Sequence, residues 1–336
     1  MVKVKTRFDA AAILISCFIL LLMLALLINP AEYMASVSKG LNVWALSVVP
    51  SLLPFLFFTH MLTDLRVIDK IARKTEKFTK KLFNCPGVSS YVYIMSIFSG
   101  DPIGAKVLSE LYEKNLVTKN QCARIATFTS TSGPLFVIGT VGASLLLSPF
   151  AGVIILIAHL LASLLNGILY RGYKRKKDTP EINEKFVKTP PADIGKAMSD
   201  GIYDSVLSIL IIGGYIALFF MAIDVLHDFY ILQPFESFFN WLFNLLGLPG
   251  GLGGGLASGI IEKTRGCFEI AGSGASLAVK TVLCCGIISW GSLSIQMQSL
   301  TFLKKCDVKF GFYFLQKLTH SLMAVAICIP LVLLLM

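Results

Sequence analysis

The chain has 336 residues, 55% of them apolar, with a mean hydropathy of +0.74. This composition excludes an ordinary soluble domain. The net charge of +10 is unevenly placed: basic residues gather in 66–81, 171–196 and 304–309, whereas 225–261 contains no Lys or Arg. Because the cytoplasmic loops of membrane proteins carry the excess of Lys and Arg, this bias indicates a membrane topology rather than a nucleic-acid partner.

Five apolar runs reach the ~20 residues that a helix needs to cross a bilayer, namely 10–29, 41–62, 150–170, 202–226 and 310–336. The first is too long for a signal-peptide core and lacks a small-residue cleavage site, so we interpret it as a retained anchor. With the N-terminus in the cytoplasm, it leads outward to Pro30 and the second run returns to the basic segment 64–86. That segment has an alternative interpretation as an interfacial amphipathic helix attracted to anionic lipid.

The middle of the first half consists of short apolar pieces interrupted by glycine and proline. Breaks at SGDP (99–102) and SGP (132–134) predict a re-entrant hairpin at 88–113 and then a broken crossing at 119–147. Thr118 and Gln121 form a capping box at the start of that crossing.

The second half repeats this order of elements. The run 202–226 leads outward, a glycine-rich hairpin near 250–273 enters from outside, and a broken helix at 276–303 returns to the cytoplasm. The aromatic stretch 228–247 is interpreted as an interfacial helix, because a full crossing there would contradict the charge pattern.

Short sequence matches support an internal repeat. Leu82-Phe83-Asn84 returns as Leu242-Phe243-Asn244, Ser99-Gly100 as Ser258-Gly259, and Gly133 as Gly291. The first copy begins outside and the second inside, so the repeat is inverted. The expected fold is an all-α polytopic membrane protein, an inverted repeat in which each half has a re-entrant helical hairpin and a broken transmembrane helix. Its parts are an N-terminal transmembrane anchor (1–39), a first repeat (40–170), a cytoplasmic basic linker (171–200) and a second repeat (201–336).

The SGP break is suited to start a half-helix, because it supplies a hydroxyl cap, a glycine and then a proline at an early helical position. The free N–H groups and the positive helix end there attract oxygen atoms or an anion. The preceding half-helix ends near Thr129, where carbonyl and hydroxyl oxygens suit a cation such as Na⁺. The alternative is that these hydroxyls only cap a kink.

The charged residues of the two hairpins also have two interpretations. Glu262 paired with Arg265, and Asp101 with Lys106, would only hold the hairpin tips together. In the functional interpretation the tips line a polar site for a small hydrophilic solute, with Glu262 and Asp101 as proton or cation ligands.

The polar residues of 292–298 fall on two helical faces, Ser294 with Gln298 and Ser292 with Gln296. They either line the site or hold helices together. Lys280, Lys317 and His320 are expected to snorkel or pack rather than bind a ligand. The candidate substrate-binding residues are Asp101, Lys106, Ser130, Thr131, Ser132, Gly133, Glu262, Thr264, Arg265, Ser292, Ser294 and Gln298.

The sequences SGDPIGAKVLSEL, SGPLFVIGTVG and SGIIEKTRG, the last followed by GSLSIQMQ, resemble the sporulation integral membrane protein YlbJ family. That family belongs to the nucleoside-recognition gate group, which is similar to spore maturation proteins and concentrative nucleoside transporters. The resemblance covers residues 40 to 330 and implies a setting in spore formation. The chain departs from the family pattern at the presumed site. Asp101 stands where an aromatic residue is usual, 129–131 and Arg265 where Asn is frequent, and Gln296 where His is found.

Together these features predict a bacterial multi-pass cell-membrane protein, with a cytoplasmic N-terminus, that binds or transports a small polar, nucleoside-like solute or an ion. Its expected partners are the lipid bilayer and this solute, with Na⁺ or H⁺ as the candidate coupling ion. No enzymatic activity, metal site or other cofactor is expected, because the sequence lacks the corresponding motifs. Gate relatives suggest a homo-oligomer by analogy alone. The alternative function is a non-transporting scaffold or assembly factor needed for spore formation.

Overall fold

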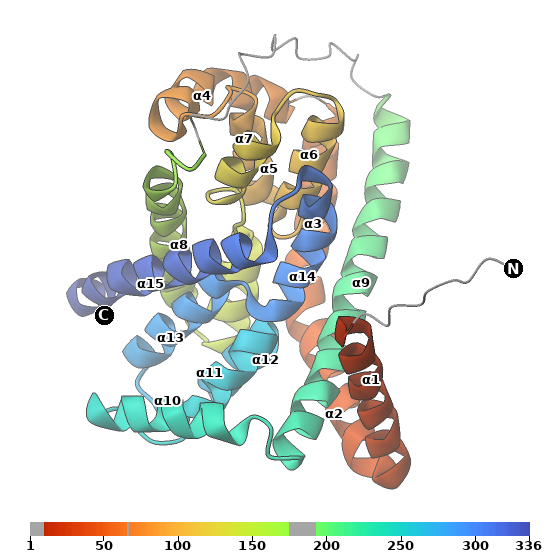
Figure 1. Ribbon diagram of the computed structural model, residues 1–336, viewed down its shortest axis with the longest axis vertical. Helices are drawn as coiled ribbons and strands as arrows, with labels where there is room; N and C mark the ends of the chain where they lie inside the picture. The colour runs from red at the N-terminus through yellow and green to blue at the C-terminus, as the bar shows by residue number, and fades with distance from the viewer. Residues whose placement is uncertain (1–9, 66, 175–192) are drawn as a thin grey trace, which may run out of the picture.

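The computed structural model describes residues 10–65, 67–174 and 193–336, and their regular secondary structure is entirely helical (Figure 1). The predicted all-α class is therefore confirmed. Most of the predicted linker 171–200 lies outside the described residues, as does the basic N-terminus.

The first half begins with a helical hairpin whose turn is only one residue long. Its second helix starts at Pro30, whereas the sequence predicted a spanning helix only from residue 41. Proline at the first position and Glu32 in the first turn suit a helix N-terminus, which explains the earlier start. In chain order the elements are α1 (Ala10–Ile28), α2 (Pro30–Val43), the π-helical η1 (Trp44–Val48), α3 (Val49–Asp64), α4 (Val67–Phe83), α5 (Ser89–Ser99), α6 (Ile103–Glu113), α7 (Lys119–Ala126), the π-helical η2 (Phe136–Leu145) and α8 (Pro149–Leu169).

The second half begins with one long helix, which starts earlier than predicted. The Asp193 carboxylate accepts hydrogen bonds from the backbone N–H groups of Gly195 and Lys196 and so caps this helix, which makes the end of the predicted linker helical. The elements are α9 (Ile194–Asp228), α10 (Gln233–Leu245), α11 (Leu252–Ile261), α12 (Lys263–Gly272), α13 (Leu277–Trp290), α14 (Ser292–Leu303), the 3₁₀ turn η4 (Lys304–Cys306) and α15 (Phe310–Leu335).

Both predicted hairpins and both broken helices are present. Helices α5 and α6 form the first hairpin, with its tip at 100–102, and α11 and α12 form the second, with its tip at Glu262. The first broken helix is interrupted over 127–133 and the second at Gly291. The predicted capping box of Thr118 and Gln121 is formed at the start of α7.

The two halves run in opposite directions. In Figure 1, α3 rises to α4 at the upper end, whereas α9 descends to α10 at the lower end. The hairpin of α5 and α6 lies in the upper half and the hairpin of α11 and α12 in the lower half. Each half therefore has the same order of elements with reversed polarity, as the inverted repeat predicted.

Five helical segments of the described residues are long and apolar enough to cross a membrane: Pro30–Leu62, Pro149–Leu169, Ile194–Asp228, Leu277–Cys306 and Phe310–Leu335. Four of them contain runs that the sequence predicted, and the fifth is the second broken helix. Helix α1 contributes a shorter apolar stretch, Ile13–Ile28. The amphipathic helix α4 lies at the upper end with Phe83 buried and Lys77 and Lys81 exposed, which fits the interfacial alternative.

The centre of the molecule is a three-helix contact that joins the repeats. Helix α8 of the first half packs against α13 and α15 of the second. On α8 the contact is built from small residues, because Ala151, Ala158 and Ala162 are fully buried. Small residues let membrane helices approach closely, and this packing brings the breaks of both broken helices to the middle of the structure.

One sequence correspondence between the repeats is wrong. Ser258-Gly259 was matched to Ser99-Gly100, but it lies inside α11 rather than at a hairpin tip. A Cβ atom added at Gly266 of α12 would lie 2.2 Å from the Gly259 Cα, so this glycine pair sets the close approach of the two hairpin helices. The structural counterpart of the 100–102 tip is instead Glu262.

Candidate functional site

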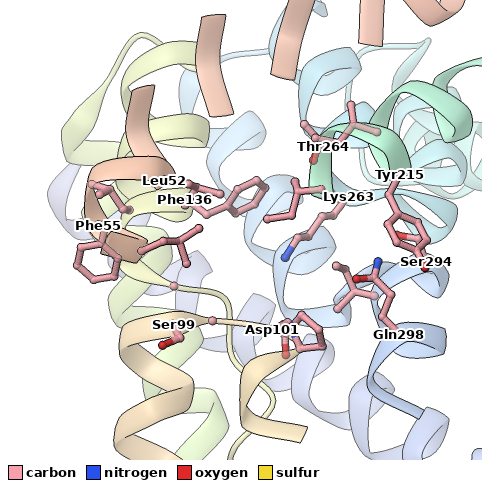
Figure 2. Close-up of a pocket in the computed structure, with 18 of the residues that line it drawn as sticks. Leu52, Phe55, Ser99, Asp101, Phe136, Tyr215, Lys263, Thr264, Ser294 and Gln298 are labelled. Atoms are coloured by element: carbon pink, nitrogen blue, oxygen red, sulfur yellow. The ribbon is translucent and has the colours of Figure 1, made fainter. Parts of the chain in front are cut away.

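A cavity of about 740 Å³, including its open mouth, lies where the two repeats meet. It is bounded by α3 and α9, by both hairpin tips, by η2 and by α14. Leu52, Phe55 and Phe136 form an apolar wall on one side, and the polar residues lie opposite and below (Figure 2). The polar residues that line it include Ser99, Asp101, Glu262, Lys263, Thr264, Ser294 and Gln298.

The first hairpin contributes Asp101, which follows Gly100 at the tip. The backbone conformation and the close packing at Gly100 require a glycine. Gly100 has a φ of +73°, and a Cβ atom there would lie 2.8 Å from the backbone nitrogen of Gly133. The tip therefore touches the break of the first broken helix directly. Asp101 accepts a hydrogen bond of 3.1 Å from the Ser130 hydroxyl, and both Asp101 and Gly133 line the cavity.

The break over 127–133 is held by side chains from helices α5, α8 and α15. Ser96 of α5 binds the Thr129 carbonyl and Thr131, and His159 of α8 accepts from the Ser132 N–H at 3.0 Å. Lys317 of α15 donates to the Ser130 carbonyl at 3.0 Å. These contacts satisfy backbone groups that lipid could not, and they bury Ser130, Thr131 and Ser132.

The second hairpin contributes Lys263, which the sequence did not single out. Its ammonium group donates to the Ser132 hydroxyl at 3.0 Å and lies 4.6 Å from the centre of the Phe136 ring. The side chain reaches into the cavity and is only 7% exposed (Figure 2). Its neighbour Glu262 caps α12, because its carboxylate accepts from the Arg265 N–H at 2.7 Å.

Within the described part of the chain, neither charge pair of the structural alternative, Glu262 with Arg265 or Asp101 with Lys106, is formed between the side chains. The Arg265 guanidinium binds Asp224 of α9 and Glu269, not Glu262, so it ties the second hairpin to α9. Lys106 points to the surface of α6, and within the described residues no ion pair joins it to Asp101. Lys106 and Arg265 do not line the cavity, so we no longer count them as candidate binding residues. Helix packing, rather than nearness in sequence, sets the partners of these charges.

The two predicted faces of α14 have different roles. Ser294 and Gln298 line the cavity. Ser292 is fully buried against Ser294 at 3.3 Å, and the Gln296 amide donates to the Trp290 carbonyl at 3.0 Å. Ser294 and Gln298 thus remain candidate binding residues, whereas Ser292 and Gln296 are placed as the packing interpretation expects, with Ser292 as a supporting residue. Thr264 also lines the cavity.

Of the two expected roles, Lys317 packs rather than snorkels, because it is 1% exposed and its ammonium group reaches the first break. Tyr313, one turn earlier, binds the Ser130 hydroxyl at 2.6 Å. A lysine well inside an apolar run such as 310–336 is a sequence signal that marks Lys317 for attention, although it does not show which group the lysine binds. His320, which binds the His159 carbonyl, packs as expected.

Comparisons with known proteins agree with this geometry. Residues 45–164 match the family model described as Gate, nucleoside recognition. The chain is 28% identical over 328 residues to the sporulation integral membrane protein YlbJ of Bacillus subtilis strain 168, covering 93% of this chain and 80% of that protein.

Solved structures of CNTnw share the fold. A variant of CNTnw in an outward-facing state gives a TM-score of 0.63 with 15% identity, covering 93% of this chain and 89% of that one. CNTnw in an inward-facing substrate-bound state gives a TM-score of 0.62 with 13% identity, covering 93% and 90%. At such low identity this likeness shows the fold alone.

Proposed function

We propose that this chain, which is similar to YlbJ and matches the nucleoside-recognition Gate model over residues 45–164, binds a small polar solute between its repeats and moves it across the membrane. The observation that carries this proposal is that both hairpins and both broken helices contribute residues to one cavity. The transporter-like fold, solved for CNTnw in outward- and inward-facing states, supports it.

The polar groups of the cavity favour a solute with a hydrogen-bond-accepting or anionic group. One carboxylate oxygen of Asp101 accepts a hydrogen bond from the Ser130 hydroxyl, and the Glu262 carboxylate caps the N-terminus of α12. Lys263 has three N–H donors and gives one to Ser132, so it can offer others to a solute. The apolar wall of Leu52, Phe55 and Phe136 suits a flat apolar face on the same molecule, such as a nucleoside base.

Ion coupling and a role in spore formation are further parts of the proposal. Asp101 Oδ2 is buried and has no hydrogen-bond partner within the described residues, so this carboxylate has room for a proton or a cation. The name of the B. subtilis relative suggests that this chain acts during sporulation.

Ligand-dependent thermal stability of the purified protein tests the proposed binding. The panel contains nucleosides, nucleobases and small carboxylates, each with and without Na⁺. A solute that binds the folded state raises its unfolding temperature by mass action. We expect Lys263→Gln to weaken the response by roughly ten- to a hundredfold in Kd, because a charge-assisted hydrogen bond contributes about 1.5–3 kcal/mol.

Lys106→Gln is the matched control, because it removes the same charge from the exposed side of α6. It should respond like the unaltered protein. A folded protein that responds to none of these solutes would contradict the binding proposal. If the hairpin variants of that protein also supported normal spore formation, the scaffold alternative would be favoured.

A further inference from the structure

A second cavity lies where α7 and α15 begin and the chain leaves α8, in the half of the molecule that holds α4 and α7 (Figure 1). It encloses about 370 Å³, including its open mouth. Its walls carry three lysines, Lys119, Lys174 and Lys309, together with Asp307 and the aromatic rings of Tyr173 and Phe312. None of these residues belongs to the cavity between the repeats.

Positive charge is in excess in this second cavity. Lys119 Nζ lies 3.6 Å from Asp307 Oδ2, so the single carboxylate offsets one of the three lysines. Lys174 Nζ lies 5.2 Å from the centre of the Tyr173 ring, a neutral partner. Within the described part of the chain, neither Lys174 nor Lys309 forms an ion pair with a carboxylate.

The walls that carry these lysines are fixed by packing between the two repeats. The Tyr173 carbonyl accepts a hydrogen bond of 2.9 Å from Arg124 Nη1. The Tyr173 ring stacks on Phe312 of α15 with ring centres 4.0 Å apart and an interplanar angle of 17°. One wall thus comes from the segment that leaves α8 and the other from the second repeat, and the stacked rings join them.

The position of the cavity indicates the ligand. The apolar helices next to it end at Leu169 and begin again at Phe310. Because such helices span the hydrocarbon, we expect the lysines beyond their ends to lie at the level of lipid headgroups. The charge bias of the sequence predicts this end to be cytoplasmic, where the anionic lipids and soluble phosphates of a cell are found.

We propose that this second cavity binds a phosphate group, presented by an anionic phospholipid headgroup or by free phosphate. Lysine ammonium groups bind phosphate as point charges, and a basic pocket between helices on the cytoplasmic side is a typical headgroup site. The ligand contacts the segment that follows the first repeat, through Lys174, and the second repeat, through Lys309, at the same time.

The test uses the full chain in nanodiscs of phosphatidylcholine, with thermal unfolding as the readout. In one arm phosphatidylglycerol replaces part of the lipid; in the other, sodium phosphate is titrated against sodium chloride at equal ionic strength. The double variant Lys174→Gln/Lys309→Gln is compared with Lys114→Gln/Lys304→Gln, which removes the same charge from exposed positions at the same end.

We expect phosphatidylglycerol or phosphate to stabilise the protein, and the cavity variant to need roughly tenfold more of that ligand for the same stabilisation. The control variant should behave like the unaltered protein. The arm that shows the effect identifies the source of the phosphate. No stabilisation in either arm, or an equal loss in both double variants, would overturn the proposal.

Discussion

Besides Arg124, three Lys and Arg side chains are buried in the described residues, and each of the three has a different kind of partner. Arg265 binds two carboxylates, Lys317 binds a carbonyl at the first break, and Lys263 binds a hydroxyl and an aromatic face. Of these three, Lys263 alone lines the cavity. A buried charge must be paired or hydrogen-bonded. Lys263 has the weakest partners of the three, so its ammonium group is the one that can still donate hydrogen bonds to a solute.

At the residue scale, we predict energetic coupling between Arg265 and Asp224. Breaking a fully buried ion pair costs about 3–5 kcal/mol; Arg265→Gln should cost less here, because the Asp224 side chain is 26% exposed. Adding Asp224→Asn should recover part of the loss, since no unpaired carboxylate then remains. Unfolding temperatures of the two single variants and the double variant measure this coupling.

The same set of two single variants and one double variant, made with Glu262→Gln and Arg265→Gln, serves as the comparison. It should give near-additive losses, because Glu262 contacts the Arg265 backbone rather than its guanidinium. Strong coupling there, with none to Asp224, would restore the pairing that the sequence predicted.

Local signals predicted the single-residue features that depend on neighbours in sequence. The Thr118 cap and the breaks at 99–102 and 132–134 were recognised, because glycine, proline and hydroxyl residues act on the backbone beside them. The roles of Lys263 and Lys317 were not recognised. Their partners lie 131 and 187 residues away, so only the folded arrangement brings them together.

At the element scale, the hairpins and broken helices were predictable, but the packing between helices was not. Gly259 was assigned to a hairpin tip because its sequence resembles the first tip. It instead allows α11 to approach α12 at Gly266. Likewise, the π-helical turns η1 and η2 could not be predicted, because their apolar sequences are equally compatible with an ordinary buried α-helix.

We predict that Gly266→Ala destabilises the second hairpin. The added Cβ atom would lie 2.2 Å from the Gly259 Cα, so the helices must separate at a cost of about 1–3 kcal/mol. Gly272→Ala, at the end of the same helix, is the control, because a Cβ atom there meets nothing within 4 Å. The unfolding temperatures of the two variants test this prediction. Equal unfolding temperatures for Gly266→Ala and Gly272→Ala would show that the contact between α11 and α12 is not tight.

At the scale of the whole molecule, the inverted repeat places corresponding elements at opposite ends. The loop after α6 lies at the upper end and the loop between α10 and α11 at the lower end of Figure 1. The charge bias of the sequence predicts that the upper end is cytoplasmic, so the loop after α6 should face the cytoplasm and the loop between α10 and α11 the outside of the cell.

Thiol labelling tests this orientation. Cysteine introduced by Gly250→Cys, in the lower loop, should react with a membrane-impermeant reagent in intact cells, whereas Lys114→Cys should react only after permeabilisation. Seven of the eight native cysteines are buried, so Cys17→Ser gives a suitable background. Labelling of both introduced positions from one side would contradict the inverted arrangement.

The central claim is that a solute crosses the membrane through the cavity between the repeats. Uptake of a radiolabelled solute from the thermal-stability panel into proteoliposomes, at several solute concentrations, tests it most directly. The account predicts saturable uptake that Lys106→Gln retains and Lys263→Gln loses. Uptake that is absent, or equal in the two variants, would contradict it.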